Sequence, residues 1–182
     1  MIASQDRSYY FGASDTDKIM GNWKSESFAR WWMQKLSLDR GSFQTKHTAA
    51  GTHWEHRILQ HVNPDMELDR QIIIEDLRLR VNLDGNDEDT IHEVKTYEYA
   101  KGYSLPMKHI QQVQVQMFAS GFRRAKIDAY GLLENDYVNY LAEIDPRRLK
   151  DFSIPYREDW VNNAYLPRLR YLAECLKEGR FP

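Results

Sequence analysis

The sequence predicts an α/β domain in which helices flank a mixed central β-sheet. Apolar residues recur at helical spacing in the first third of the chain and in its last quarter. The middle of the chain instead alternates apolar and polar residues with a period of two. A length of 182 residues suits one domain, which we expect to span residues 1–182.

The composition indicates a folded protein without a strong overall charge. Hydrophobic residues make up 42% and aromatic residues 13% of the chain, which excludes global disorder. The 25 basic and 27 acidic residues leave a net charge of −2, so nothing attracts the whole molecule to a polyanion. Any nucleic-acid site must therefore come from local placement of charge.

Cysteine content and hydropathy indicate the cellular compartment of the protein. The single cysteine, Cys175, excludes an internal disulfide and a cysteine-based zinc or iron–sulfur site. Asp6 and Arg7 precede any apolar run, so no signal peptide is expected. No stretch approaches the roughly 20 apolar residues that span a bilayer. We therefore expect a cytoplasmic protein with no membrane partner.

Three helices are expected before the sheet. Ser14 and Asp17 suggest a capping box that opens a short helix ending near Gly21. Ser25 is placed to cap a second helix, and a third is expected over residues 48–62. The apolar positions are Phe28, Trp31, Trp32 and Leu36 in the second helix, and Trp54, Ile58, Leu59 and Val62 in the third.

Strands are expected in the middle of the chain. Residues 77–84 alternate strictly and predict a half-buried strand, with an earlier strand at 72–74. Residues 84–87 form a turn signal, so residues 90–97 should return as the partner strand of a hairpin.

The remaining elements alternate between helix and strand. Pro106 suits the first turn of a helix that Gly121 would end. Two strands are then expected, over residues 125–133 and 137–144. A final helix should run from about residue 160 to residue 176, with Pro167 as a kink or boundary.

The hairpin carries the residues best suited to chemistry. Asp84 ends the first strand, and Glu93 and Lys95 point the same way from the second. Two converging carboxylates, with the Val94 carbonyl, suit Mg²⁺ or Mn²⁺. A neighbouring ammonium can orient or deprotonate water and stabilise a phosphate, so the set suits phosphodiester hydrolysis. On spacing alone, however, an ordinary solvated Glu93–Lys95 pair is the more common outcome.

Two helices add polar side chains to this picture. Glu55 lies on a largely apolar helix face, where it either pairs with a cation or metal or reaches solvent at the edge of the face. His109, Gln112 and Gln116 share one face of the helix after Pro106. Amides there can hold water or phosphate, although a partly exposed polar face is the usual meaning of such a cluster.

Together these residues resemble the YqaJ-like viral recombinase, or phage lambda exonuclease, family of PD-(D/E)XK nucleases. The order and spacing of the motifs match the family from residue 7 to about residue 133. A leucine precedes Asp84 where the family's name implies a proline. The matching segments are residues 7–14, Gly51-Thr52-His53-Trp54-Glu55, Asp84-Gly85 with Glu93-Val94-Lys95, and residues 112–117.

The resemblance implies a fold, a cofactor and a set of site residues. It implies a restriction-endonuclease-like core that uses Mg²⁺, with Mn²⁺ able to substitute. The implied metal ligands are Glu55, Asp84, Glu93 and Val94, the implied catalytic residues are Asp84, Glu93, Lys95 and Gln112, and the residues implied to hold a DNA 5′-phosphate are Arg7 and Ser14.

The resemblance also implies an activity and partners. The activity would be 5′→3′ exonuclease digestion of double-stranded DNA in phage-type recombination, producing single strands for an annealing protein. The partners would be double-stranded DNA ends, that annealing protein and further copies of the chain in a trimeric ring. A phage-encoded protein of this kind would act in the host cytoplasm.

Two other functions remain open from the sequence. One is a structure-specific endonuclease with the same core, and the other is a catalytically silent DNA-binding or assembly protein. The intact Asp84, Glu93 and Lys95 argue against the silent protein. Basic clusters at 123–126 and 147–150 either track DNA or are ordinary surface charge.

The three histidines of the third helix also have a simple interpretation. His53, His56 and His61 lack the H-E-x-x-H pattern of zinc enzymes. We therefore expect helix-surface or DNA-contacting groups at these positions.

Overall fold

The structure is a computed structural model that describes residues 8–39 and 46–182. Within these residues a five-stranded sheet has the order β1-β2-β3-β4-β5. β3 and β4 run parallel and the other neighbours antiparallel, so the sheet is mixed, as the sequence predicts. The strands are β1 (Glu67–Ile74), β2 (Leu79–Asn86), β3 (Thr90–Glu98), β4 (Arg124–Leu132) and β5 (Leu149–Pro155).

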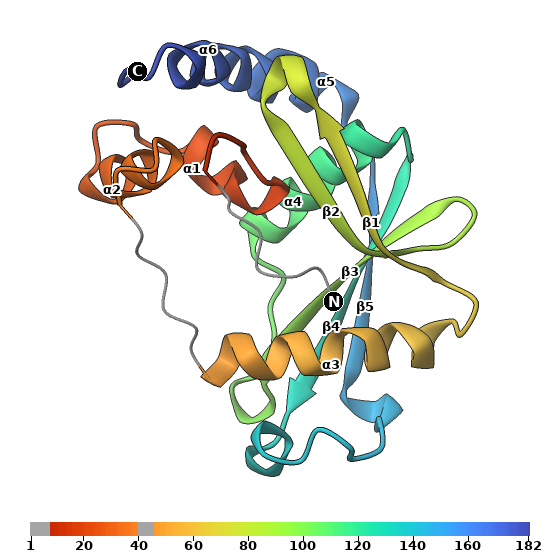
Figure 1. The fold of residues 1–182 in the computed structure, drawn as a ribbon. Helices are drawn as coiled ribbons and strands as arrows, with labels where there is room; N and C mark the ends of the chain where they lie inside the picture. The colour runs from red at the N-terminus through yellow and green to blue at the C-terminus, as the bar shows by residue number, and fades with distance from the viewer. Residues whose placement is uncertain (1–7, 40–45) are drawn as a thin grey trace.

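Helices cover both faces of this sheet (Figure 1). The helix that crosses over between the parallel strands β3 and β4 is α4, which packs on the face opposite α3. None of the helices in the described ranges is long and apolar enough to cross a membrane. The helices are α1 (Thr16–Met20), α2 (Glu26–Lys35), α3 (Lys46–Val62), α4 (Met107–Ser120), α5 (Glu158–Trp160) and α6 (Leu166–Lys177).

Two apolar clusters hold the layers together. On the α4 face, fully buried Phe11 and Trp32 pack with alternate β2 residues and with α6. On the α3 face, fully buried Trp54 and Ile58 pack against Tyr130 of β4. Burial of side chains this large contributes roughly 1.5–3 kcal/mol each, so both helix layers are firmly attached to the sheet.

The helix boundaries follow local chemistry. The Ser25 hydroxyl accepts a hydrogen bond from the Phe28 N–H (3.2 Å), which confirms the expected cap of α2. The first turn is different: the Asp15 carboxylate, and not a Ser14–Asp17 pair, accepts the Gly12 N–H (2.7 Å). Gly121, at φ +83°, ends α4 as expected.

The final helix is interrupted. A π-helical turn, η6 (Val161–Tyr165), precedes Pro167. Proline has no N–H to donate, and its ring crowds the carbonyl four residues earlier, so a wider turn at this point relieves both problems.

The strand expected over residues 137–144 is wrong. This segment follows a 3-10 turn, η4 (Glu134–Tyr137), and exposes Val138 (78%) and Leu141 (88%). The last strand is β5 instead, and it pairs with β4 from Tyr130 to Arg124. A strand needs a free sheet edge, and with β3 on one side and β5 on the other, β4 offers none.

Candidate active site

The sheet opens at Asp84. β2 pairs with β3 only through Gly85–His92 and Asn86–Ile91, beside the hairpin turn. Beyond this point the two strands diverge, and the Asp84 Oδ2 atom accepts a hydrogen bond from the Val94 N–H (2.9 Å). The Asp84 side chain thus takes the place of a backbone acceptor of β2. Its carboxylate lies where β2 and β3 diverge, which we call the fork between the two strands.

The glycine after Asp84 allows this arrangement. A Cβ atom at Gly85 would collide with the side chain of Met66 and crowd Leu59 of α3. A residue with a Cβ atom here would require Met66 and Leu59 to shift, so the glycine favours the close packing of these side chains on the end of β2. Asp84-Gly85 therefore combines an oxygen ligand with the close approach of the neighbouring helix.

Glu93 is buried on the α4 face of β3, with 3% of its surface exposed. Its Oε1 atom accepts hydrogen bonds from Lys95 Nζ (2.5 Å) and Gln112 Nε2 (2.6 Å). Its Oε2 atom accepts one from Gln116 Nε2. An ionised carboxylate has about four lone-pair positions, so these three donors leave about one on Oε2 for a further ligand.

Gln116 is a contact that the sequence-based site set did not include. Gln112 and Gln116 are one helical turn apart, so both reach the same carboxylate from α4. The polar face expected on this helix contained the signal, because Gln116 lies on it with Gln112. Which of the glutamines faces Glu93 depends on how α4 docks, and helical spacing alone does not determine that.

The carboxylates of this region repel one another. Burial, followed by the charges of Glu93 and Glu55, raises the pKa of Asp84 well above its ordinary value. Burial, followed by the charge of Glu93, also raises the pKa of Glu55 on α3. The positive charge of Lys95 acts in the opposite direction and lowers the pKa of both Asp84 and Glu55. The three carboxylates thus share a region whose negative charge Lys95 only partly balances.

Lys95 remains an ammonium group in this setting. Burial alone would lower its pKa, but the charges of Glu93 and Asp84 outweigh burial and raise it. The side chain is about one-fifth exposed, so it can still meet a ligand at the surface. As an ammonium group, Lys95 carries a positive charge and donates hydrogen bonds, and it cannot accept a proton.

The donor set fits a hard divalent cation. Asp84 has a second oxygen that accepts no hydrogen bond from the described residues, and the same holds for the Glu55 carboxylate. Carboxylate oxygens are the ligands that Mg²⁺ and Mn²⁺ prefer. A cation here would offset the repulsion that raises the pKa values of Asp84 and Glu55. A ligand role for the Val94 carbonyl remains a prediction.

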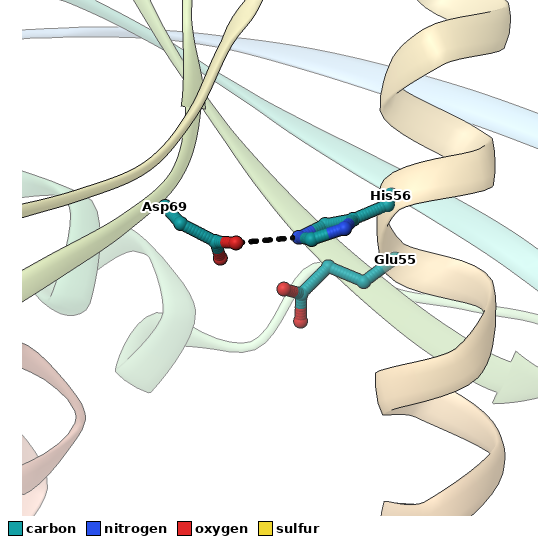
Figure 2. Close-up of side chains that lie close together, drawn as sticks. All are labelled: Glu55, His56 and Asp69. Atoms are coloured by element: carbon teal, nitrogen blue, oxygen red, sulfur yellow. Dashed lines mark ion pairs between the residues drawn. The ribbon is translucent and has the colours of Figure 1, made fainter. Parts of the chain in front are cut away.

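A second group of ligands adjoins Glu55. One potential ligand atom from each of Glu55, His56 and Asp69 lies within 4.8 Å of the others. Figure 2 shows the three side chains and the ion pair between His56 and Asp69. His56 Nε2 is 3.0 Å from Asp69 Oδ2. His56 is thus half-buried and paired with Asp69, and a DNA-contacting role for it stays a prediction. The sequence contains no signal for Asp69, because this pairing depends on how β1 lies against α3.

His53 and His61 are exposed on the surface of α3, as expected. His61 is exposed near the end of α3. His53 stacks on Tyr140, with ring centroids 4.2 Å apart. Neither belongs to a group of ligands among the described residues.

His109 and Tyr103 border the site beside Lys95. The Tyr103 hydroxyl and His109 Nδ1 are 2.8 Å apart. Burial, followed by the Lys95 charge, lowers the pKa of His109 to about 4. Burial also raises the pKa of Tyr103 to about 12. Both groups are therefore neutral near pH 7 and add hydrogen-bonding capacity without charge.

The residues expected to hold a 5′-phosphate are only partly described. Ser14 is exposed in the 3-10 turn η1 (Ala13–Asp15), which packs against α4 and β2. Asp15 anchors that turn through an ion pair with buried Lys35 (2.7 Å). Arg7 lies outside the described residues. A phosphate-binding role for Ser14 and Arg7 therefore remains a prediction.

Comparisons of the whole chain identify similar folds. No known protein family matches the chain by sequence, and no curated protein does so either. An alkaline exonuclease from Laribacter hongkongensis superposes with a TM-score of 0.64 at 18% identity, over 94% of this chain and 93% of that one. The same protein in complex with dAMP gives the same values.

A phage-related exonuclease from Haemophilus somnus 129PT superposes with a TM-score of 0.67 at 12% identity, over 93% of this chain and 92% of that one. At these identities the likeness concerns the fold. The chain shares, over almost its full length, the restriction-endonuclease-like α/β fold of these exonuclease structures.

Proposed function

We propose that this protein is a Mg²⁺-dependent deoxyribonuclease that digests double-stranded DNA from its 5′ ends. The observation that carries the proposal is the placement of Asp84 in the β2–β3 fork near Glu93, which contacts both Lys95 and Gln112. The likeness of the fold to two exonuclease structures supports the same chemistry.

Asp84, Glu93, Glu55 and the Val94 carbonyl would hold the cation in this proposal. When bound, a divalent ion polarises a phosphoryl oxygen and makes water a better nucleophile. Lys95, as an ammonium, stabilises negative charge that develops on the phosphate and orients the attacking water. Gln112 and Gln116 hold Glu93 in one orientation, so that its remaining lone pair stays directed at the site.

One assay separates this activity from the alternatives. A linear duplex labelled at either the 5′ or the 3′ end is compared with a covalently closed circle, with Mg²⁺ or with EDTA. We expect early release of the 5′ label as mononucleotide, late release of the 3′ label, an intact circle and no reaction in EDTA. A nicked or linearised circle would indicate an endonuclease. Binding without any cleavage would indicate a silent DNA-binding protein.

A 5′-phosphate pocket at Arg7 and Ser14 predicts a preference for phosphorylated ends. A serine hydroxyl beside an arginine suits phosphate recognition. We expect Ser14→Ala and Arg7→Ala to reduce the ratio of rates on phosphorylated and unphosphorylated duplexes. Ser153→Ala, at an exposed β5 position, is the control and should leave that ratio unchanged. Equal rates on both ends in the parent protein would count against the pocket.

The assembly and partners in this proposal derive from the resemblance to the phage lambda exonuclease family. A trimeric ring around DNA would have about three times the chain mass of 21.6 kDa, which light scattering on the purified protein measures directly. A monomer at all concentrations would contradict the ring. Co-purification with a single-strand annealing protein would test the proposed partner.

A further inference from the structure

We propose that Glu55, His56 and Asp69 form a second divalent-cation site, which prefers a first-row transition metal such as Mn²⁺ or Zn²⁺ to Mg²⁺. The site would link α3 to β1 beside the carboxylates of the proposed nuclease site. This inference goes beyond the proposed function, with which it shares Glu55, and stands on the geometry of three side chains.

The three side chains approach one another from two elements. Glu55 and His56 extend from α3, and Asp69 points towards them from β1, as Figure 2 shows. Two ligand atoms that each lie about 2.1 Å from one ion are at most about 4.2 Å apart. The observed atoms lie within 4.8 Å of one another, so the ion requires little or no closure of the group.

The ligand types decide which cation the site prefers. Imidazole nitrogen suits Zn²⁺ and other transition metals, whereas Mg²⁺ favours oxygen ligands and gives up its water reluctantly. One imidazole and two carboxylates make a mixed N/O site. Three protein ligands leave at least one coordination position for water or a phosphate oxygen.

A simple ion pair between His56 and Asp69 explains less of the structure. It accounts for the 3.0 Å contact but leaves the half-buried Glu55 carboxylate without a hydrogen bond from any described residue. A partly buried carboxylate without a partner is costly. A cation that joins all three groups would bind one oxygen of Glu55 and leave the other oxygen for the cation of the proposed nuclease site.

Asp69 occupies an unusual backbone position in β1. Its φ is +60°, and the β1–β2 ladder passes from Leu68–Gly85 to Arg70–Leu83 without a pair at Asp69. Such a conformation costs of order 1–3 kcal/mol and persists only where surrounding contacts hold it. The ion pair with His56 is one such contact, and a cation bound to both side chains would add another.

Glu55 connects this site with the proposed nuclease site. It interacts electrostatically with His56 and Asp69 on one side and with Glu93 on the other. A cation held by Glu55, His56 and Asp69 would therefore fix the position of α3 relative to β1 and place positive charge next to the Asp84–Glu93 pair.

Mn²⁺ binding to the full chain without DNA tests the site. Pulsed EPR of bound Mn²⁺ detects coupling to imidazole ¹⁴N. We expect this coupling in the parent protein, its loss in His56→Gln and its retention in His61→Gln, the matched control from the exposed end of α3. No ¹⁴N coupling in the parent, or equal coupling in His56→Gln, would overturn the proposal.

Two further variants complete the experiment. Asp69→Asn keeps the shape of the side chain and should weaken Mn²⁺ affinity at this site by about tenfold or more, as measured by calorimetry. Asp84→Asn removes a ligand of the proposed nuclease site and should retain the ¹⁴N coupling. A failure of the second cation site can therefore be distinguished from a failure of the proposed nuclease site. Zn²⁺ should displace Mn²⁺ from the site, and displacement by equimolar Mg²⁺ would contradict the preference for transition metals.

Discussion

Glu93 shows most clearly how a single residue connects the fold to the proposed chemistry. It is almost fully buried, yet it is ionisable, and three side-chain donors surround it. A buried charge is tolerated only when it is paired and hydrogen-bonded. The donors Lys95, Gln112 and Gln116 supply this compensation, and the same donors orient the carboxylate towards the fork.

Replacing Lys95 tests the ammonium directly. Lys95→Ala should lower the rate of DNA cleavage by about 10²- to 10³-fold, because the charge that stabilises the reacting phosphate is lost. DNA affinity measured in Ca²⁺ and the far-UV CD spectrum should change little. Lys101→Ala is the control, since Lys101 forms an exposed pair with Glu98. A Lys95→Ala protein that cuts as fast as its parent would disprove the proposed role.

Gln116 provides a second test at the residue scale. Gln116→Leu leaves Oε2 of buried Glu93 without its donor, which should cost about 1–3 kcal/mol of unfolding free energy. The rate of cleavage should fall as well, because Glu93 is less firmly oriented. Gln111→Leu on the same helix is the control, because Gln111 does not donate to Glu93. Urea denaturation of both variants should show the larger loss for Gln116→Leu.

At the scale of elements, the fork between β2 and β3 determines the site. The hairpin was predictable from alternation and a turn signal, and so was the shared direction of Glu93 and Lys95. The divergence of the strands was not predictable, because alternation does not reveal that the Asp84 side chain accepts the Val94 N–H where the ladder ends. The strand expected over residues 137–144 was wrong for a similar reason: the place beside β4 is taken by β5, which comes later in the chain, and the local sequence does not reveal this.

The end of α4 gives a prediction at the element scale. Gly121 lies at φ +83°, and a Cβ atom there would meet nothing within 4 Å. The cost of Gly121→Ala is therefore conformational only, about 1–2 kcal/mol. Gly121→Asn should lose less, because asparagine tolerates the left-handed region better. Equal midpoints of urea unfolding for parent and Gly121→Ala would show that the turn adopts another conformation.

At the scale of the whole molecule, two apolar layers hold opposite faces of the sheet and so bring distant segments to one place. Glu55 comes from the α3 layer, Gln112 and Gln116 come from the α4 layer, and Asp84 lies between them. The carboxylates gathered in this way repel one another. Without a bound cation, this repulsion therefore lowers the stability of the fold. With a bound cation, the same carboxylates serve as ligands of the proposed site.

This conflict predicts opposite effects of one substitution. Asp84→Asn removes a repelled charge while its amide oxygen can still accept the Val94 N–H, so the metal-free protein should be at least as stable as the parent. Mg²⁺ at about 100 times its dissociation constant should add about 2.7 kcal/mol to the parent. For a chain of this size that is a rise of roughly 5–10 °C in Tm.

The Asp84→Asn protein should show little of this rise in a thermal scan with Mg²⁺. Ser153→Ala again serves as the matched variant and should respond to Mg²⁺ as the parent does. An equal Mg²⁺ response in Asp84→Asn would mean that the ion binds without Asp84, and the proposed ligand set would then be wrong.

The sequence by itself determined the α/β architecture, most helix boundaries, the hairpin and the common face of Glu93 with Lys95, because these follow from periodicity and local capping. Only the tertiary structure decided that Gln116 joins Gln112 on Glu93, that Asp84 sits in an open fork and that Asp69 reaches His56. These contacts join residues on different elements, and their meeting depends on how helices dock on a twisted sheet. Local sequence patterns carry no information about that docking.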